Sequence, residues 1–466
     1  MLGMGNMRQW LMNISLVGGW FPAAAFAVVA VLSVTLLVSA AVSKRDGRIL
    51  ATVLPIGVAA VSGMVGYVVA WLLSDVFVVF GVGLGSRVMA WAAAGFAIAG
   101  FAIVHIVLSR GMMRVAAAIL TVFAILAAAI GIDQSYGEYA TIGSLFGEDS
   151  YSQADLTGLA KRKDLITVAQ WRKQAANGTI RNIPANGTVN KIDIPATKSQ
   201  FEARKALVYL PPAALADSKR KPALPVVLML SGQPGSPGRV FQAGGIQTMM
   251  DGYAKTHDGL APIVIAADQL GADSHNTLCV DSKVYGNALT YLTQDVVDWV
   301  KTNLPAAQDA KDWAIAGFSQ GATCSLQIGV NHPDLFGTMI PTDSEIKPTN
   351  GSRQEMIDRF FDGDTTAYEN QVPVNAIRNH APTHQMLIIG AGEKDTTSIR
   401  NVKTIAPVAA KAGMRVAAVE SSGNAHDWHA VQDVLRYGLA VFGHDTGLDG
   451  ANPNLSDYPN LKRITI

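Results

Sequence analysis

The stretch Trp313-Ala-Ile-Ala-Gly-Phe-Ser-Gln-Gly321 decides the fold, because an apolar run leads directly into the pattern G-x-S-x-G at Gly317–Gly321. A run of small residues with helical character follows it. A strand, a tight turn that carries a serine, and a helix form the context of a nucleophile elbow. With 44 glycines in the chain, the bare pattern is weak, and a glycine-rich turn is the alternative. The flanking strand and helix favour Ser319 as a nucleophile.

The acid and the base that a serine nucleophile requires follow later in the chain. The apolar run 387–390 predicts a buried strand, and Asp395 comes shortly after it. A second strand-like run, 415–420, leads into a loop that carries His426. Ser319, Asp395 and His426 therefore occur in the order nucleophile, acid, histidine that is typical of α/β-hydrolases.

Each of these residue types suits the chemistry. A serine hydroxyl is a poor nucleophile until a neutral imidazole takes its proton during attack, which is the role expected of His426. A carboxylate on the other ring nitrogen fixes the tautomer and stabilises the imidazolium, which is the role expected of Asp395. Glu393 and Asp343 remain alternative acids, and His429 remains an alternative base.

The tetrahedral intermediate of acyl transfer also needs two backbone N–H donors. One normally comes from the residue after the nucleophile, here Gln320, and one from a loop after an earlier strand. The apolar run 225–230 predicts that strand, and the turn 231–238 could aim the amide of Gln233 inward. A glycine–proline turn without a catalytic part is the alternative for this segment.

Five further segments are Ala206-Leu-Val-Tyr-Leu-Pro-Pro212, Leu230-Ser-Gly232, Asn276-Thr-Leu-Cys-Val-Asp281, Tyr291-Leu-Thr-Gln-Asp-Val296 and His426-Asp-Trp428. With the Ser319 elbow, they make residues 191–443 resemble the esterase D and mycolyltransferase-like branch of the α/β-hydrolases, particularly its extracytoplasmic actinobacterial members. The resemblance implies acyl-ester hydrolysis or acyl transfer through a serine ester, without a metal or organic cofactor. It also implies that Ser319, Asp395 and His426 occupy the catalytic positions. Mycolyltransferases differ in having a cleavable signal and usually a glutamate acid.

The organisation of the chain changes along its length. From Thr188 onward, strand-like segments alternate with helical ones, which predicts a mostly parallel sheet with helices on both faces. We therefore expect an α/β-hydrolase domain at 191–466, which is long enough for one large core. The preceding segment, 133–190, is polar and contains Gly, Ser and Asn, so we expect a linker with some local helix.

The first 132 residues are too apolar for a soluble domain. Four runs fit the roughly 20 residues that a helix needs to cross a bilayer, and only scattered polar groups interrupt them: Phe21–Val42, Ile49–Leu73, Met89–Leu108 and Val115–Ile132. This pattern predicts a four-helix transmembrane domain. A cleavable signal at the first run is the alternative, and the other three runs would still anchor the chain.

Basic residues predict the orientation of these runs. Lys44, Arg45 and Arg48 lie between the first and second runs, and Arg110 and Arg114 between the third and fourth. Because basic loops stay in the cytoplasm, the hydrolase domain is expected on the outer side of a bacterial plasma membrane. The resemblance to actinobacterial proteins further implies that this protein comes from an actinobacterium.

Cys279 and Cys324 are the two cysteines of the 466 residues. Both fall in the hydrolase half, and Cys324 lies shortly after Ser319 on the expected elbow helix. An oxidising exterior would permit a disulfide that ties the Cys279 loop to that helix. Two buried free thiols are the alternative. Neither C-x-x-C nor H-E-x-x-H occurs, so zinc and catalytic-cysteine functions are disfavoured.

The formal net charge of +1 gives no electrostatic footprint for nucleic acid. A membrane-tethered serine hydrolase outside the cell would meet membrane lipids and envelope esters, so we expect hydrolysis of an acyl or aminoacyl lipid or of an acylated glycan. One alternative is an acyltransferase that uses the same Ser319 ester and a sugar or lipid hydroxyl. The other is a non-catalytic lipid-binding or scaffolding module, which the presence of all three catalytic residue types disfavours.

Overall fold

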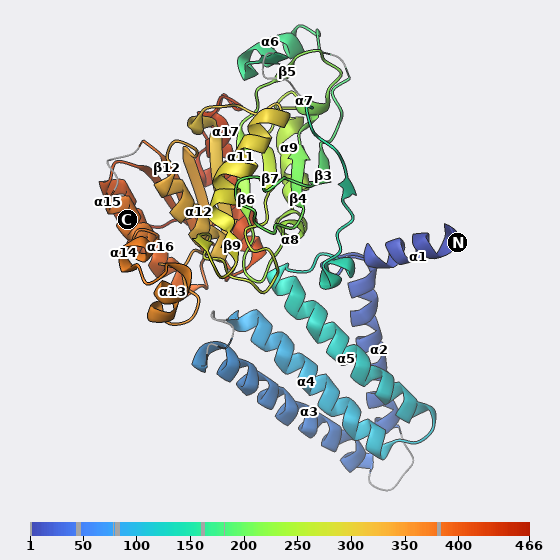
Figure 1. The fold of residues 1–466 in the computed structure, drawn as a ribbon. Helices are drawn as coiled ribbons and strands as arrows, with labels where there is room; N and C mark the ends of the chain where they lie inside the picture. Colours follow the sequence, from blue (N-terminus) through green and yellow to red (C-terminus); the bar gives the residue numbers. More distant parts are fainter. Residues whose placement is uncertain are drawn as a thin grey trace. The chain divides into compact units, whose positions relative to one another are not determined.

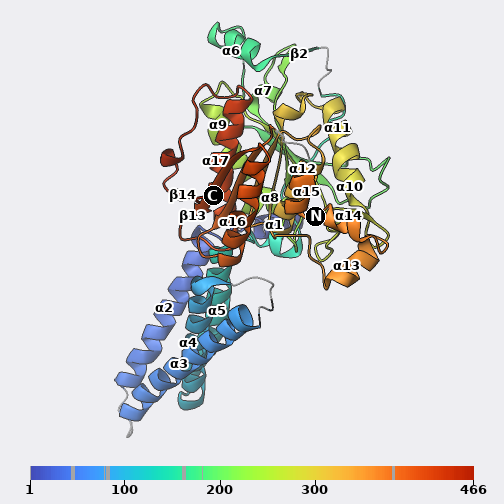
Figure 2. The same ribbon diagram turned by 90° about the vertical axis from the view of Figure 1, so that its left-hand side faces the viewer.

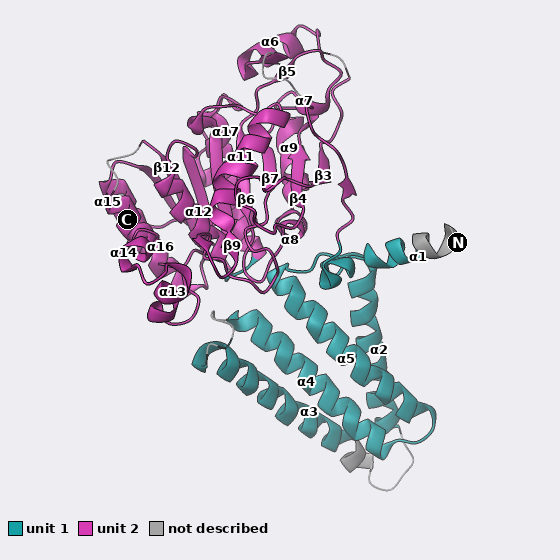
Figure 3. Ribbon diagram, in the orientation of Figure 1, with its two compact units in different colours: residues 1–148, 425–427 teal, residues 149–424, 428–466 magenta. Residues whose placement is uncertain are grey.

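The computed structural model describes residues 2–42, 48–77, 79, 84–159, 164–180, 182–379 and 384–466. By its contacts the chain divides into two compact units (Figure 3). The first comprises Met1–Glu148 with Ala425–Asp427, and the second comprises Asp149–Asn424 with Trp428–Ile466. Lys44 and Arg45, on which the predicted orientation partly depends, lie outside the described residues.

Long apolar helices build the first unit. In the described part of the chain these are α2 (Trp20–Ala41), α3 (Arg48–Trp71), α4 (Gly85–Leu108) and α5 (Met112–Tyr136), preceded by the shorter α1 (Leu2–Met12) (Figure 1). Small residues let the helices approach closely. A Cβ added to Gly100 would lie 2.3 Å from Ser62 Oγ, and one added to Gly95 would lie 2.6 Å from the Cβ of Ala128.

The apolar segments of these helices match the four predicted runs. They cover Trp20–Ala41, Thr52–Val76, Gly85–Leu108 and Met112–Tyr136, each long enough to cross a bilayer. Large apolar side chains face outward from them, since Val31, Met64, Val107 and Val122 are 63 to 70 % exposed. Soluble proteins rarely expose such contiguous apolar surface. The helices are therefore compatible with membrane anchoring.

A single large sheet organises the second unit. Among the described residues its strand order is β1-β3-β4-β7-β6-β10-β11-β12-β13-β14. The strands from β7 to β13 in this order are parallel, whereas β4 is antiparallel to β3 and β7, and β14 is antiparallel to β13. The strand bounds are β1 Ser152–Gln153, β3 Thr188–Ile192, β4 Ala206–Leu210, β6 Val226–Leu230, β7 Ile263–Ala266, β10 Trp313–Phe318, β11 Thr338–Thr342, β12 Met386–Gly392, β13 Arg415–Ser421 and β14 Leu461–Arg463. The predicted mostly parallel sheet is confirmed.

Helices cover both faces of this sheet (Figures 1 and 2). One core packs against α11 (Val296–Asn303), α12 (Gln320–Asn331) and α16 (Thr396–Lys411), and the other against α8 (Pro237–Ala243), α9 (Ile246–Lys255) and α17 (Trp428–Asp445). Alternate residues of one strand enter the two cores. In β10, Ile315 faces the first core and Ala316 the second. Because both faces are buried, the central strands are apolar throughout rather than alternating.

The predicted linker, 133–190, is partly built into the second unit. Within it, β1 pairs in parallel with β3, which itself crosses the expected boundary at 190. The helix α6 (Val168–Ala176) begins with a capping box at Thr167. It buries Trp171, whose indole N–H donates to the carbonyl of Asp258 at 3.1 Å. The sheet therefore begins in a segment whose polar composition indicated an open connection.

A disulfide joins Cys279 to Cys324, which confirms the predicted pair. Cys324 lies on α12, and Cys279 lies in the loop that precedes the short strand β8 (Asp281–Ser282). The bond closes a chain separation of 45 residues. It thereby ties the loop 276–281 to the helix that begins at the elbow.

Replacing both cysteines with serine, C279S with C324S, should lower the free energy of unfolding by about 2–4 kcal/mol, because the unfolded chain regains the entropy of a long loop. Urea unfolding of the two proteins, with and without a thiol reductant, measures this. The reductant should destabilise the wild type alone. Equal stability of wild type and double variant under oxidising conditions would contradict the prediction.

Candidate active site

Ser319 occupies the turn between β10, which ends at Phe318, and α12, which begins at Gln320. Its backbone has φ 55° and ψ −116°, a conformation that residues other than glycine rarely adopt. The amide of Ser319 donates to the carbonyl of Thr342 at 3.0 Å, and its carbonyl accepts from the amide of Thr323 at 3.0 Å. This strained strand–turn–helix geometry is that of a nucleophile elbow.

The two glycines of the elbow are required by close backbone approaches. A Cβ on Gly317 would come within 2.2 Å of the carbonyl oxygen of Gly321. A Cβ on Gly321 would come within 2.3 Å of the carbonyl oxygen of Ser231 and 2.6 Å of that of Leu230. No other residue type fits these positions without moving backbone. The G-x-S-x-G pattern is therefore dictated by packing and is no accident of glycine content.

The other predicted residues follow β11, β12 and β13, the three strands that come after β10 in the order of the sheet. The register pairs Phe318 with Thr342, so the ends of β10 and β11 meet at one edge of the sheet. Asp343 directly follows β11, Asp395 follows β12, and His426 lies beyond β13. One side-chain ligand atom from each of Asp343, Asp395 and His426 lies within 4.8 Å of the others. The structure thus brings the predicted imidazole together with two of the three candidate acids.

Asp395 is the N-cap of α16. Its Oδ1 accepts from the amides of Thr397 at 3.1 Å and Ser398 at 3.0 Å, and its Oδ2 accepts from the hydroxyl of Ser398 at 2.6 Å. These donors favour the charged carboxylate, which is the form that stabilises an imidazolium. They also hold its side chain in one orientation, as positioning a histidine requires.

Asp343 is the more deeply buried of the two acids, at 1 % exposure. It lies in the left-handed region with φ 55°, and its Oδ1 accepts from the amide of Gly392 at 2.9 Å. Such a conformation at a non-glycine residue beside a nucleophile is typical of functional sites. Asp343 therefore remains an alternative acid on structural grounds.

Glu393 has a different place. Its carboxylate accepts from Lys462 Nζ at 2.9 Å and from the amide of Gly423 at 2.7 Å, which joins β12 to β14. The hydrogen bond from Lys462, followed by that from Gly423, lowers the pKa of Glu393. These partners explain Glu393 as a structural residue. Likewise, the imidazole in the acid cluster is that of His426, whereas His429 lies within α17.

Hydrogen bonds of neighbouring side chains hold the loop that carries His426. The side-chain amide of Asn424 donates to Ser421 Oγ at 2.9 Å and to Asp433 Oδ2 at 3.2 Å. Asp427 Oδ2 accepts from the amide of Ala425 at 2.7 Å. The acidic residue after the histidine thus closes a local turn. In the segment His426-Asp-Trp428, Asp427 therefore stabilises the loop, and His426 supplies the imidazole.

The two residues predicted to supply the oxyanion donors lie next to Ser319 in the chain and in the loop after β6. Gln320 begins α12, so its amide lies at a helix N-terminus. A Cβ on Gly232 would lie 3.5 Å from the Cβ of Ser319, so the loop after β6 runs directly beside the nucleophile. Gln233 is the next residue of that loop, and its Nε2 donates to the carbonyl of Ser274 at 3.2 Å. The catalytic use of both amides remains a prediction.

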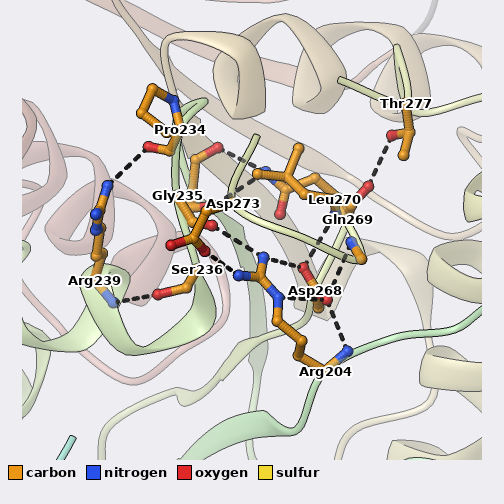
Figure 4. A network of polar contacts seen from close by, with 12 residues as sticks. Arg204, Pro234, Gly235, Ser236, Arg239, Asp268, Gln269, Leu270, Asp273 and Thr277 are labelled. Atoms are coloured by element: carbon orange, nitrogen blue, oxygen red, sulfur yellow. Dashed lines mark hydrogen bonds and ion pairs between the residues drawn. The ribbon is translucent and has the colours of Figure 1, made fainter. Parts of the chain in front are cut away.

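A polar network that the sequence did not reveal supports this loop (Figure 4). Buried Asp268 accepts from Arg204 Nη2 at 2.7 Å and Nε at 2.9 Å, and Arg204 Nη2 also donates to the carbonyl of Gly235 at 2.9 Å. Arg204 also pairs with Asp273. Burial opposes the charge of the guanidinium, but the bonds to Asp268 raise the pKa of Arg204 above its ordinary value. These partners of Arg204 lie 31 or more residues away in sequence, so no local sequence pattern indicates the network.

The recognised segment 276–281 is explained by its contacts around the elbow. Asn276 Oδ1 accepts from Gln320 Nε2 at 3.3 Å, and the hydroxyl of Thr277 donates to the carbonyl of Gln269 at 2.7 Å. Cys279 forms the disulfide. Asp281 accepts from the amide of Thr290 at 2.9 Å. The segment therefore serves as a scaffold beside the nucleophile.

One imidazole and two carboxylates are also a donor set that can bind a divalent cation. Asp395 accepts three hydrogen bonds from the first turn of α16, and Asp343 accepts one from Gly392. These hydrogen bonds orient both carboxylates. A reaction that needs no metal remains the prediction for this site.

Comparison with known proteins agrees with this geometry. Residues 198–438 match the Esterase family. An uncharacterized protein of Corynebacterium glutamicum is 32 % identical over 330 residues, which cover 69 % of this chain and 74 % of that protein.

Among the solved structures with a similar fold, we describe three. An S-formylglutathione hydrolase from Agrobacterium tumefaciens is 16 % identical with a TM-score of 0.47, covering 57 % of this chain and 98 % of that one. A ferulic acid esterase is 17 % identical with a TM-score of 0.45, covering 57 % and 99 %. MPT51 of Mycobacterium tuberculosis is 15 % identical with a TM-score of 0.40, covering 55 % and 96 %. These likenesses concern the fold alone.

Amide variants of the three candidate acids test which carboxylate serves His426. Asp395→Asn should lower kcat for an ester by on the order of 10⁴-fold, because the imidazolium loses its counter-charge, while asparagine still caps α16. Glu393→Gln should retain nearly full activity. Initial rates of the two variants, with Asp343→Asn alongside, measure this. A large loss in Asp343→Asn with none in Asp395→Asn would transfer the role to Asp343.

Gly321→Ala should reduce ester hydrolysis by on the order of 100-fold, because displacement of the elbow by about 1 Å misplaces the nucleophile. The matched control is Gly252→Ala in α9, where an added Cβ meets nothing within 4 Å. That variant should keep its activity and gain up to about 1 kcal/mol of stability. Initial rates of ester hydrolysis and urea unfolding midpoints of both variants measure these effects. Full activity in Gly321→Ala would contradict the conclusion that a Cβ at this position displaces the elbow.

Proposed function

Because the chain belongs to the Esterase family and is a carboxylesterase-type hydrolase, we propose that it is a membrane-anchored serine esterase that hydrolyses an acyl or aminoacyl ester of a cell-envelope lipid. The reaction would take place outside the plasma membrane. The observation that carries this proposal is the strained elbow at Ser319, beside strand ends that hold Asp395 near His426.

The proposed reaction has two steps. The hydroxyl oxygen of Ser319 attacks the ester carbonyl while His426 takes its proton, and the amides of Gln233 and Gln320 stabilise the oxyanion. His426 then gives that proton to the leaving alkoxide, which departs as an alcohol. In the second step a water molecule, deprotonated by His426, attacks the carbonyl of the Ser319 ester. His426 then returns the proton to the oxygen of Ser319 as the acyl–oxygen bond breaks, which releases the carboxylic acid and restores the free serine. Asp395 stabilises the imidazolium in both steps.

The four apolar helices support a lipid substrate. An enzyme held at the bilayer meets lipid esters at high local concentration, whereas a soluble ester would require no anchor. In this proposal residues 1–132 anchor the chain and 191–466 carry the reaction. Residues 133–190 connect these parts, and β1 within that segment belongs to the sheet. Arg110 lies between α4 and α5, and Arg114 lies in the first turn of α5. With the basic residues after the first apolar run, they support an external catalytic domain. The Cys279–Cys324 disulfide suits an oxidising exterior.

Ester hydrolysis and acyl transfer share the Ser319 ester, and the two differ only in whether water or another hydroxyl accepts the acyl group. The family supports either reaction class. We favour hydrolysis and treat transfer to a sugar or lipid hydroxyl as a distinguishable outcome of the experiment.

The test compares membranes of a host that lacks the gene after expression of wild type, Ser319→Ala and Ser325→Ala. Ser325 is the matched control, because it lies on the same helix and its hydroxyl donates to the carbonyl of Ala322 at 2.8 Å. Extracted envelope lipids are incubated with each membrane, and released fatty acid, released amino acid and newly acylated products are measured. Wild type and Ser325→Ala should release an acid or amino acid, and Ser319→Ala should not.

Each other result has a definite meaning. Serine-dependent appearance of an acylated sugar or lipid, without free acid, would replace the hydrolase with a transferase. If wild type releases no acid and forms no acylated product beyond that of membranes without the protein, both reactions on lipids are overturned. Activity of Ser319→Ala equal to wild type would exclude Ser319 as the nucleophile.

A further inference from the structure

A buried glutamine lies between the two loops that are predicted to bind the oxyanion. Gln269 follows β7 and is 0 % exposed. Its Nε2 donates to the carbonyl oxygen of Ser231 at 2.7 Å, and it also lies 3.2 Å from Ser231 Oγ and 3.2 Å from Gln320 Oε1. Ser231 opens the loop that contains Gln233, and Gln320 follows the nucleophile. A single side-chain amide therefore contacts both loops.

The chemistry of its partners explains why this residue is a glutamine. A backbone carbonyl only accepts hydrogen bonds, so the nitrogen of the Gln269 amide must face Ser231. Its Oε1 is buried with no hydrogen-bond partner among the described residues. A buried acceptor without a partner is costly, so the oxygen of this amide does not explain why a glutamine is present. The donating N–H groups are the property that the position uses.

Gln269 is itself held firmly. Its carbonyl accepts from the hydroxyl of Thr277 at 2.7 Å, and the residue before it, Asp268, binds Arg204 (Figure 4). Arg204 in turn donates to the carbonyl of Gly235, which lies in the same loop as Gln233. The loop is thus attached to the end of β7 at Ser231 through Gln269 and at Gly235 through Arg204. Both attachments flank Gln233.

We propose that Gln269 is a positioning residue for the oxyanion hole. Its N–H groups hold the carbonyl of Ser231 and the side chain of Gln320, so that the amides of Gln233 and Gln320 converge on one oxygen. Such donors accelerate the reaction when they are in place before the charge develops. A loosened pair of loops therefore slows acylation and leaves substrate binding unchanged. This inference rests on the proposed function of Ser319.

Two substitutions test it on the full-length protein in detergent. Gln269→Glu keeps the shape and turns an oxygen toward two acceptors, and Gln269→Leu removes the donors without adding charge. With a p-nitrophenyl ester, kcat should fall at least about 10-fold and KM should stay unchanged, a smaller loss than the 10²–10³ expected on removing a donor outright. Affinity for a boronic acid that forms a tetrahedral adduct should fall in parallel with kcat. A role in folding alone would lower the unfolding midpoint and leave kcat per folded molecule unchanged.

Gln327 offers a matched control. It is also a buried glutamine, at 1 % exposure, whose Nε2 donates to the carbonyl of Leu278 at 3.1 Å and whose Oε1 has no partner among the described residues. Gln327→Glu and Gln327→Leu therefore repeat the burial costs away from Ser231 and Gln320. They should keep the kcat of the wild type once folded protein is counted.

Labelling of Ser319 by a fluorophosphonate separates the two hypotheses. If the wild type neither hydrolyses the ester nor labels at Ser319, the proposed function fails. If the wild type is active and both Gln269 variants keep its kcat and its boronic acid affinity, the inference about Gln269 is overturned. An equal loss of kcat in the Gln327 variants would overturn it as well.

Discussion

The close backbone approach beneath Ser319 is the constraint on which the rest of the site depends. Gly317 lies against Gly321, and Gly321 lies against the carbonyl oxygens of Leu230 and Ser231, with no room for a Cβ at either glycine. The first turn of α12 therefore sits directly over the end of β6. Ser319 lies in the turn between β10 and α12 in a strained conformation. The loop that contains Gln233 runs beside it. The nucleophile and its expected oxyanion donors thus share one packing requirement.

Polar contacts hold the loops around this contact in place. Arg204 and Asp268 join the loop after β6 to the loop after β7, and Gln269 extends that connection to the elbow. The disulfide and Asn276 attach the next loop to α12. In a low-dielectric interior, polar groups that find partners rigidify one arrangement, and those that do not are costly. This cost gives the site a single geometry where loops alone would be mobile.

The same apolar residue types have opposite uses in the two parts of the chain. In the sheet, residues such as Ile315 and Leu387 are fully buried between strands and helices. In α2 to α5, comparable residues such as Val31 and Val107 face outward, and small residues form the contacts between helices. Burial inside a protein and burial in a bilayer both remove apolar surface from water. Length distinguishes them, because a helix that crosses a bilayer needs about 20 apolar residues in succession.

Local patterns in the amino-acid order were enough to predict the mostly parallel sheet, the elbow at Ser319, the long apolar helices and the cysteine pair. These features depend on residues that are close in the chain, or on so few cysteines that one pairing exists. Strand register and loop paths were needed to see that Asp343 joins Asp395 near His426 while Glu393 binds Lys462. The same holds for β1, which polar composition assigned to a linker, and for the contacts of Arg204 and Gln269. Side chains from separate strands meet only after the chain reverses direction several times, and no local pattern records which of them will be neighbours.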